Sequence, residues 1–317
     1  MMKIGMIDCD NKNSKNPFPN LALMKLSAWH KAQGDSVEWY SPMFSGHMDK
    51  VYVSKVFSFS EDFQYCIDAD EIQYGGSGFA ISMINGVEVY DKTKDTSLPY
   101  EIEHIYPDYS LYGITDTAYG FMTRGCPRNC EFCHVTQMQG LKSHKVADLS
   151  EFWNGQKNIV LLDPNISACR EWKEVFQQLI DSKACVNFSQ GLDIRLMTDE
   201  KIEMLKHIKT KGVHFAWDRY EDKKLILPKL QHFASITGWN RRKIIVYCLV
   251  GDRERRVTKQ DLERIYALRD IAYPYVMIYD KASLPKGHEL KKLQRWVNNR
   301  FVWESTSTFE EYLKGNK

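Results

Sequence analysis

Between residues 117 and 285, six short apolar segments alternate with polar turns and amphipathic segments. The apolar segments span residues 118–123, 158–162, 186–190, 213–217, 243–250 and 275–279. Apolar runs of this length are typical of parallel strands that are covered on both faces by helices. Between them, apolar residues recur at helical spacing, as they do over residues 172–180. The alternation predicts an α/β fold with a parallel sheet.

A loop with three cysteines follows the first of these predicted strands. Residues 123–134 read Thr-Arg-Gly-Cys-Pro-Arg-Asn-Cys-Glu-Phe-Cys-His, so Cys126, Cys130 and Cys133 are spaced C-x3-C-x2-C. Three thiolates on one loop can bind three irons of a four-iron cluster and leave the fourth iron open to a ligand. A cluster that only transfers electrons normally has a fourth cysteine. The spacing therefore predicts a catalytic [4Fe-4S] cluster, because chemistry needs an open coordination position.

A zinc site and three ordinary buried cysteines are the alternatives to a cluster. Structural zinc loops usually pair two cysteine knuckles, and the sequence contains no second knuckle. His134 directly follows Cys133, which is a poor position for completing a zinc tetrahedron with it. The alternative function is a zinc-binding interaction protein that contacts its partner through a basic C-terminal segment.

The cysteine spacing, the aromatic Phe132 before the third cysteine and the position after a first strand resemble the radical S-adenosylmethionine (SAM) superfamily. The resemblance covers about residues 117–285 and implies a partial (β/α)6 TIM-like barrel. It also implies reductive cleavage of SAM to a 5′-deoxyadenosyl radical, which abstracts hydrogen from a substrate that the sequence does not identify. An external one-electron reductant of the flavodoxin or ferredoxin type and sensitivity to oxygen follow from this chemistry. The backbone beside Phe132 is expected to meet the adenine of SAM.

Polar residues follow the predicted strands, where α/β barrels collect their functional groups. The candidates for binding SAM are Asp163, Asn165, Asp193, Arg195, Asp218 and Arg219. Asp163 and Asn165 stand where the family often has Gly-Gly-Glu for the SAM amino group, so the chain departs from the pattern here. The resemblance implies Asp218 for the ribose, and Arg195 or Arg219 for the carboxylate. The alternative for each residue is a salt bridge or a cap on the rim of the barrel.

Cys169 lies six residues after Asp163, at the expected start of the next helix. Because a helix N-terminus lowers the pKa of a thiol, Cys169 is a candidate for donating a hydrogen atom or for carrying a covalent intermediate. A small, half-buried structural residue is the alternative. The cysteines outside the loop form no second cluster motif.

Residues 1–90 predict a small Rossmann-like α/β domain. The expected elements are strands at 3–8, 36–40, 50–57 and 71–74, and a helix that Asn20 caps and that runs to about Gln33, where Gly34 stops it. A domain of this kind before a radical SAM barrel resembles a cobalamin-binding architecture. This resemblance implies cobalamin as a cofactor and, as the alternative reaction, transfer of a methyl or alkyl group. The usual D-x-H-x-x-G segment is missing, since residues 8–14 contain no histidine, and this counts against cobalamin.

The remaining segments are a predicted linker at 91–116, the barrel at 117–285 and a C-terminal helical tail at 286–317. The 43 Lys and Arg residues nearly balance the 41 Asp and Glu residues, so the net charge of +2 gives no indication of a nucleic-acid partner. The basic side of the tail either contacts an anionic ligand or is solvated. No apolar run is long enough to span a bilayer, and the N-terminus reads as a strand. We therefore expect a cytoplasmic protein without a membrane partner.

Overall fold

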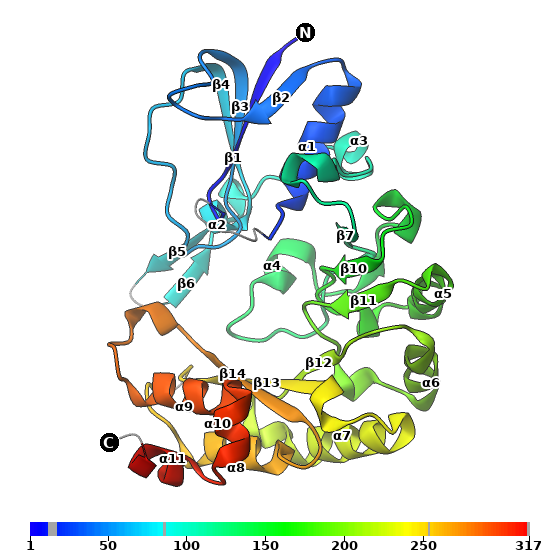
Figure 1. Ribbon diagram of the computed structural model, residues 1–317, viewed down its shortest axis with the longest axis vertical. Helices are drawn as coiled ribbons and strands as arrows, with labels where there is room; N and C mark the ends of the chain where they lie inside the picture. Colours follow the sequence, from blue (N-terminus) through cyan, green and yellow to red (C-terminus); the bar gives the residue numbers. More distant parts are fainter. Residues whose placement is uncertain (12–17, 85–86, 253, 316–317) are drawn as a thin grey trace. The chain divides into compact units, whose positions relative to one another are not determined.

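The computed structural model describes residues 1–11, 18–84, 87–252 and 254–315, which form two compact units (Figure 1). The first unit comprises Met1–Leu141 and Val146–Val160, and the second comprises Lys142–Lys145 and Leu161–Lys317. The two units are defined by contacts within the folded chain. The domain boundaries that the sequence suggests therefore remain a prediction.

A parallel sheet forms the core of the first unit. Its strands, in the order β2-β1-β3-β4, are β1 (Lys3–Asp8), β2 (Ser36–Trp39), β3 (Met48–Ser54) and β4 (Ala69–Gly75). Helix α1 (Leu21–Ala32) packs on β1, where Leu23 and Leu26 contact the same apolar cluster as Ile4. The Asn20 side chain caps the helix by accepting a hydrogen bond from the Leu23 amide at 3.2 Å. The predicted parallel α/β sheet, its helix and the cap are confirmed.

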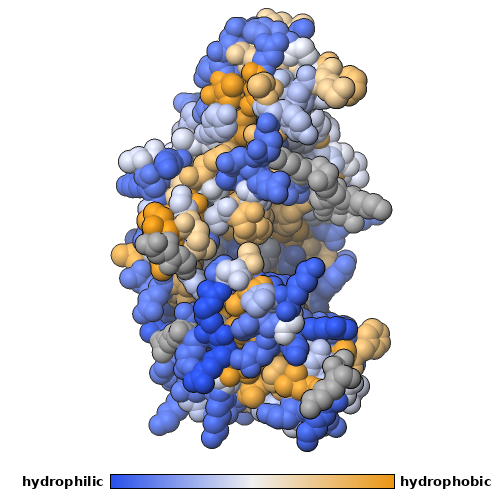
Figure 2. Space-filling view, turned by 90° about the vertical axis from the view of Figure 1, so that its left-hand side faces the viewer, coloured by the Kyte–Doolittle hydropathy of each residue, from blue (hydrophilic) through white to orange (hydrophobic). Residues whose placement is uncertain are grey.

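The rest of the first unit consists of short elements. They are α2 (Ser77–Ala80), β5 (Ile81–Ile84), β6 (Val87–Tyr90), α3 (Tyr100–Glu103), β7 (Thr117–Gly120), β8 (Thr123–Arg124) and α4 (Val135–Gln139). Strands β5 and β6 form an antiparallel hairpin that the sequence did not predict. In Figure 2, one face of the molecule is largely hydrophilic, with apolar side chains in separate patches. The stacked rings of Phe57 and Phe59, 5.1 Å apart, are among the exposed apolar groups of this unit.

The single strand predicted over residues 118–123 is wrong, because the chain breaks it into β7 and β8. The break comes directly after Gly120. A Cβ atom placed on Gly120 would lie 2.3 Å from the ring of Phe152, so this approach is open to glycine alone. Strand β8 then leads straight into the cysteine loop.

The second unit contains a three-stranded parallel sheet with helices on one face (Figure 1, yellow to red). The strands are β12 (Val213–Ala216), β13 (Ile244–Val250) and β14 (Tyr273–Ile278). Strand β10 (Asn158–Leu161) enters this unit, and β9 (His144–Lys145) and β11 (Cys185–Phe188) also belong to it. The longer helices are α5 (Trp172–Ser182), α6 (Asp199–His207), α7 (Lys223–Thr237), α8 (Lys259–Leu268) and α9 (Glu289–Asn298). Two short helices, α10 (Arg300–Ser305) and α11 (Phe309–Gly315), end the chain.

The two faces of this sheet differ. Alternate residues of β13, such as Val246 and Val250, are fully buried toward the helices. The tail docks in the same layer, since Trp303 is buried in one apolar cluster with residues of α8, α9 and β14. On the opposite face, His214 stacks on Tyr247 at 5.2 Å, and Tyr247 meets Tyr275 edge-on at 5.6 Å. The open face therefore carries an aromatic row across three strands.

The partial (β/α)6 barrel is not confirmed, because β12, β13 and β14 form a sheet of their own rather than part of a continuous six-stranded one. None of the helices that the structure describes is both long and apolar enough to cross a bilayer.

Candidate functional site

The start of the cysteine loop is hydrogen-bonded to the C-terminal end of helix α4. Gly125 enters the loop with a φ of +84°, a conformation that favours glycine, and its amide donates to Oε1 of Gln139 at 3.2 Å. The Cys126 amide donates to the Gly140 carbonyl at 3.1 Å. The short helix therefore fixes where the first thiol stands.

The three thiols have the chemistry of a cluster site. Cys126, Cys130 and Cys133 are all half-buried, and the Cys133 amide donates to the Cys130 carbonyl at 3.1 Å, which makes the turn between them tight. Thiolates are the usual ligands of iron–sulfur clusters. Among the residues that the structure describes, no three Cys, His, Asp or Glu side chains lie together in the manner of a metal site. The donor set and its anchored loop thus fit a cluster, while a formed coordination geometry is not seen.

The neighbours of the third cysteine have their own contacts. Nε2 of His134 lies 3.3 Å from a Glu88 carboxylate oxygen, and its Nδ1 lies 3.2 Å from Oε1 of Gln137. Both ring nitrogens are thereby engaged, which argues against His134 as a zinc ligand. Phe132 is half-buried on the same loop.

Asp163 and Asn165 lie just beyond strand β10 and are almost completely buried, with exposed fractions of 3% and 4%. The Asn165 carbonyl accepts a hydrogen bond from Oγ of Ser143 at 2.9 Å. Asn165 also starts a 3-10 turn over Ile166–Ala168. Two buried polar side chains at a strand end are rare enough to mark a ligand site or a structural network.

Asp193 and Arg195 are brought together by the structure. Nε of Arg195 donates to Oδ1 of Asp193 at 2.7 Å, and the Arg195 amide donates to the same oxygen at 3.1 Å. A second carboxylate, that of Asp222, lies 3.6 Å from Nη1 of Arg195. The charge of Arg195 is therefore already compensated, which corresponds to the salt-bridge alternative for this pair.

A pocket of about 70 Å³ lies at the carboxyl ends of β12 and β13. Its lining includes Asp218, Arg219, Gly251, Asp252 and Thr258. The Asp218 carboxylate accepts a hydrogen bond from the Leu249 amide at 3.0 Å, and burial raises the pKa of Asp218. The predicted Asp218 and Arg219 thus share one polar hollow, as expected for the carboxyl ends of neighbouring parallel strands.

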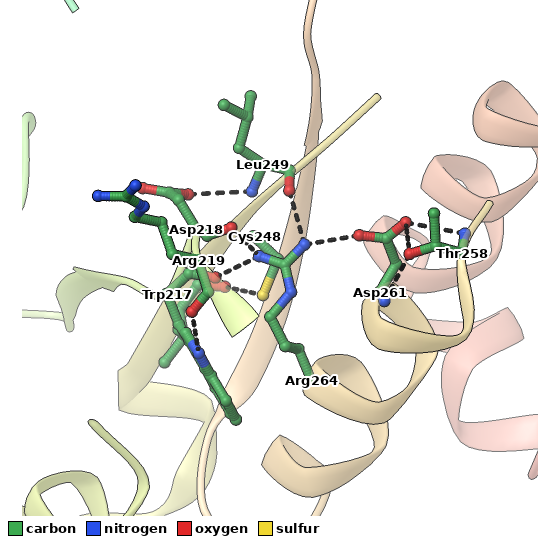
Figure 3. A network of polar contacts seen from close by, with 9 residues as sticks. Trp217, Asp218, Arg219, Cys248, Leu249, Thr258, Asp261 and Arg264 are labelled. Atoms are coloured by element: carbon green, nitrogen blue, oxygen red, sulfur yellow. Dashed lines mark hydrogen bonds and ion pairs between the residues drawn. The ribbon is translucent and has the colours of Figure 1, made fainter. Parts of the chain in front are cut away.

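Arg264 holds this pocket together and was not predicted from the sequence (Figure 3). Its guanidinium donates to the carbonyls of Trp217 and Asp218, both at 2.6 Å, and to the Leu249 carbonyl at 2.8 Å. It also pairs with Asp261 at 2.6 Å on the same helix. One buried arginine thus clamps the ends of two strands. An arginine on the apolar face of a helix was the signal that could have revealed it.

The lowered pKa expected for Cys169 is wrong. The residue precedes helix α5, which begins at Trp172, and its side chain is buried with 2% exposure. Burial, together with a hydrogen bond from Sγ to the Glu171 carboxylate at 3.2 Å, raises the pKa of Cys169 to about 11. Loss of solvation and the nearby Glu171 carboxylate raise the pKa of the thiol more than the helix N-terminus lowers it, so the thiol stays protonated at neutral pH.

A second cavity, of about 170 Å³, lies within the first unit and was not predicted. Lys25 and Arg124 both reach Oε1 of Glu103 in its wall, at 3.2 and 2.8 Å. Burial lowers the pKa of Lys25. Burial acts to raise the pKa of Glu103, but the two cations hold it below its usual value. These charged residues come from distant parts of the chain, so no local sequence pattern predicts that they lie together.

No protein-family model matches this chain, and no curated protein matches it significantly. A solved structure with a similar fold is that of the radical SAM methyltransferase TsrM from Kitasatospora setae, with cobalamin and a [4Fe-4S] cluster bound. The TM-score is 0.55 at 10% sequence identity, over 87% of this chain and 75% of that one. At this identity the likeness concerns the fold.

Proposed function

We propose that this protein is a radical SAM enzyme that binds one [4Fe-4S] cluster through Cys126, Cys130 and Cys133. The observation that carries the proposal is the set of three half-buried thiols spaced C-x3-C-x2-C on one anchored loop. A fold similar to that of a radical SAM methyltransferase supports it. When bound, the cluster would supply the electron that cleaves SAM to a 5′-deoxyadenosyl radical, for hydrogen abstraction from a substrate still to be identified. A flavodoxin- or ferredoxin-type reductant would provide that electron, and oxygen would inactivate the enzyme.

The chain offers polar groups for each part of SAM. We assign Asp163 and Asn165 to the amino group, because both are buried acceptors beyond a strand end. Asp218 is assigned to the ribose hydroxyls, since its carboxylate stands in a pocket. For the SAM carboxylate we favour Arg219, because it lines the same pocket as Asp218. Phe132 is assigned to the adenine by resemblance alone.

Cys169 is better suited to donating a hydrogen atom than to acting as a nucleophile. With a pKa of about 11, it keeps its S–H bond at neutral pH. A hydrogen-atom donor needs that bond, whereas a covalent nucleophile needs the thiolate. The role therefore requires a substrate radical to reach a side chain that is 2% exposed.

Anaerobic reconstitution tests the cluster. We expect about four irons and four sulfides per chain, with an EPR signal on reduction. Each of the Cys126→Ala, Cys130→Ala and Cys133→Ala variants should lose the cluster, whereas Cys66→Ala, at an exposed cysteine outside the loop, should keep it. Unchanged iron content in the three loop variants, or one zinc per chain in anaerobically purified protein, would refute the proposal.

Cobalamin-dependent methyl transfer is the second candidate, favoured by the cobalamin in the structurally similar methyltransferase. The loop after β1 does not offer a cobalt ligand, because it has no histidine. Its carboxylates are also engaged, with Asp10 accepting hydrogen bonds from the amides of Val56 and Phe57 at 2.7 and 3.2 Å. Cobalamin titration tests this reading, and S-adenosylhomocysteine rather than 5′-deoxyadenosine as the product would favour it.

A further inference from the structure

The net charge of +2 conceals an uneven distribution between the two units. By sequence, the second unit carries 31 Lys and Arg residues against 21 Asp and Glu residues, a net charge of +10. The first unit carries 12 against 20, a net charge of −8. Such asymmetry within one chain indicates a polyanionic partner for the basic part.

Exposed cations of the second unit gather where the strands of its parallel sheet begin. We call this set the basic edge, and it consists of Lys209, Lys211, Arg242, Lys243 and Arg300. In the strand register, Val213 of β12 lies opposite Ile244 of β13, so the segments that precede these strands are neighbours. The Arg300 guanidinium lies 5.3 Å from the centre of the Tyr273 ring, at the start of β14. The basic edge therefore follows three adjacent strands.

Backbone packing shows how close two of these segments are. A Cβ atom added to Gly212 would lie 2.9 Å from the Lys243 carbonyl oxygen. Lys211, directly before Gly212, and Lys243 thus belong to touching backbones. Neighbouring strands are about 4.8 Å apart, so three strand starts span about 10 Å. Each nucleotide of a stacked strand rises by about 3.4 Å along the helix axis, so that length corresponds to about three nucleotides.

Acidic groups do little to neutralise the basic edge. Arg241, beside it, is paired with Glu304 at 2.8 and 2.9 Å. Asp270 is an exposed carboxylate in the segment before β14. Within the described part of the chain, neither these nor other carboxylates form an ion pair with the five cations of the basic edge. Their charge is therefore available to a ligand.

Aromatic side chains lie among these cations. Phe301 follows Arg300 directly, and 89% of it is exposed. The Lys243 ammonium lies 5.2 Å from the centre of the Trp239 ring. Proteins that bind single-stranded nucleic acid combine cations along the backbone with aromatic rings on which bases stack. An acidic protein surface needs only the cations, so Phe301 favours nucleic acid over a protein partner.

We propose that the basic edge and Phe301 form a binding surface for single-stranded nucleic acid. Lysine and arginine side chains would contact successive phosphates, and the phenyl ring would stack on a base. The exposed aromatic ring favours unpaired bases over a duplex, because the bases of a duplex are already stacked on one another. The proposal concerns the second unit alone and is independent of the cluster chemistry.

Fluorescence anisotropy with labelled oligouridylate, oligothymidylate and a duplex of equal length tests this surface in the full chain. We expect the single strands to bind more weakly as salt increases. Replacing two contacts in Lys211→Gln/Arg242→Gln should flatten the slope of log K against log salt by about 1.4, at about 0.7 per contact. Phe301→Ala should weaken binding about tenfold at every salt concentration without changing the slope.

The matched control is Lys92→Gln/Lys94→Gln, which removes two exposed cations from the first unit and should bind like the parent. Circular dichroism checks that all variants are folded. A preference for uridylate or thymidylate would identify RNA or DNA as the source. Absence of binding to both, or equal binding by parent and basic-edge variants, would overturn the proposal. So would binding only to polyglutamate or to anionic phospholipid vesicles.

Discussion

Replacing Arg264 should destabilise the second unit more than replacing any exposed arginine. The side chain is 3% exposed and binds three main-chain carbonyls and the Asp261 carboxylate. Arg264→Met keeps most of the volume but removes every one of these donors. It leaves a buried carboxylate without its cation, which costs about 3–5 kcal/mol, and buried carbonyls without donors, at about 1–3 kcal/mol each.

Because the adjoining pocket lets water reach part of this network, we expect a total loss of about 4–6 kcal/mol rather than the full sum. That is a large fraction of the about 5–15 kcal/mol that stabilises a typical protein. Arg264→Lys keeps the charge but not the planar fork, so it should lose about 2–3 kcal/mol. Arg242→Met, at an exposed arginine, should stay within about 0.5 kcal/mol of the parent.

Urea unfolding followed by tryptophan fluorescence measures these differences, with Trp217 as a fully buried reporter inside the network. If Arg264→Met fails to fold, the Arg264→Lys variant and its amide hydrogen exchange around β12 and β13 give the second readout. A loss below about 1 kcal/mol in Arg264→Met would refute the reasoning, since that much is expected from a single ordinary hydrogen bond.

Three further predictions concern single positions. Asp218→Asn should increase the free energy of unfolding at neutral pH, because burial raises the pKa of Asp218 in the folded state above its unfolded value. Urea unfolding at a series of pH values should show that this increase vanishes below pH ~3.9, the ordinary pKa of an aspartate. At pH 8, mass spectrometry should find Cys169 alkylated by iodoacetamide far more slowly than the exposed Cys66, and equal rates would contradict its burial and raised pKa. Gly76→Ala should cost at least about 2 kcal/mol in urea unfolding, since φ is +98° and the new Cβ would lie 2.3 Å from the Lys55 carbonyl oxygen; an unchanged midpoint would contradict this.

Local features were predictable because they depend on neighbours in the sequence. The cap at Asn20, the helix from Trp172 and the end of α7 at Gly238 occur as side-chain chemistry and glycine conformation require. The close approach of the Phe152 ring to Gly120, where β7 ends, was not predictable, because Phe152 lies 32 residues after Gly120 in the sequence. Contacts of that kind have no local signal.

The residues of the candidate site also divide into those that the sequence marks and those whose environment only the fold determines. The cysteine spacing marks the loop, because three ligands of one cluster must lie close together in the chain. The environments of the other candidates came only from the fold. Arg195 is occupied by Asp193, and Glu171 with burial reverses the expected pKa shift of Cys169. Burial and charge pairing are sums over the surrounding structure, so residue type alone does not determine them.

By itself, the sequence determined the alternation of strands and helices, their caps and the three-thiol loop, since each depends on periodicity or spacing within a short segment. The tertiary structure alone decided which polar groups are buried together, as with Arg264 at the ends of β12 and β13. It also decided how a nearly neutral chain separates into an acidic unit and a basic one. These properties arise from contacts between residues that are far apart in the chain, and such contacts form only when the chain folds.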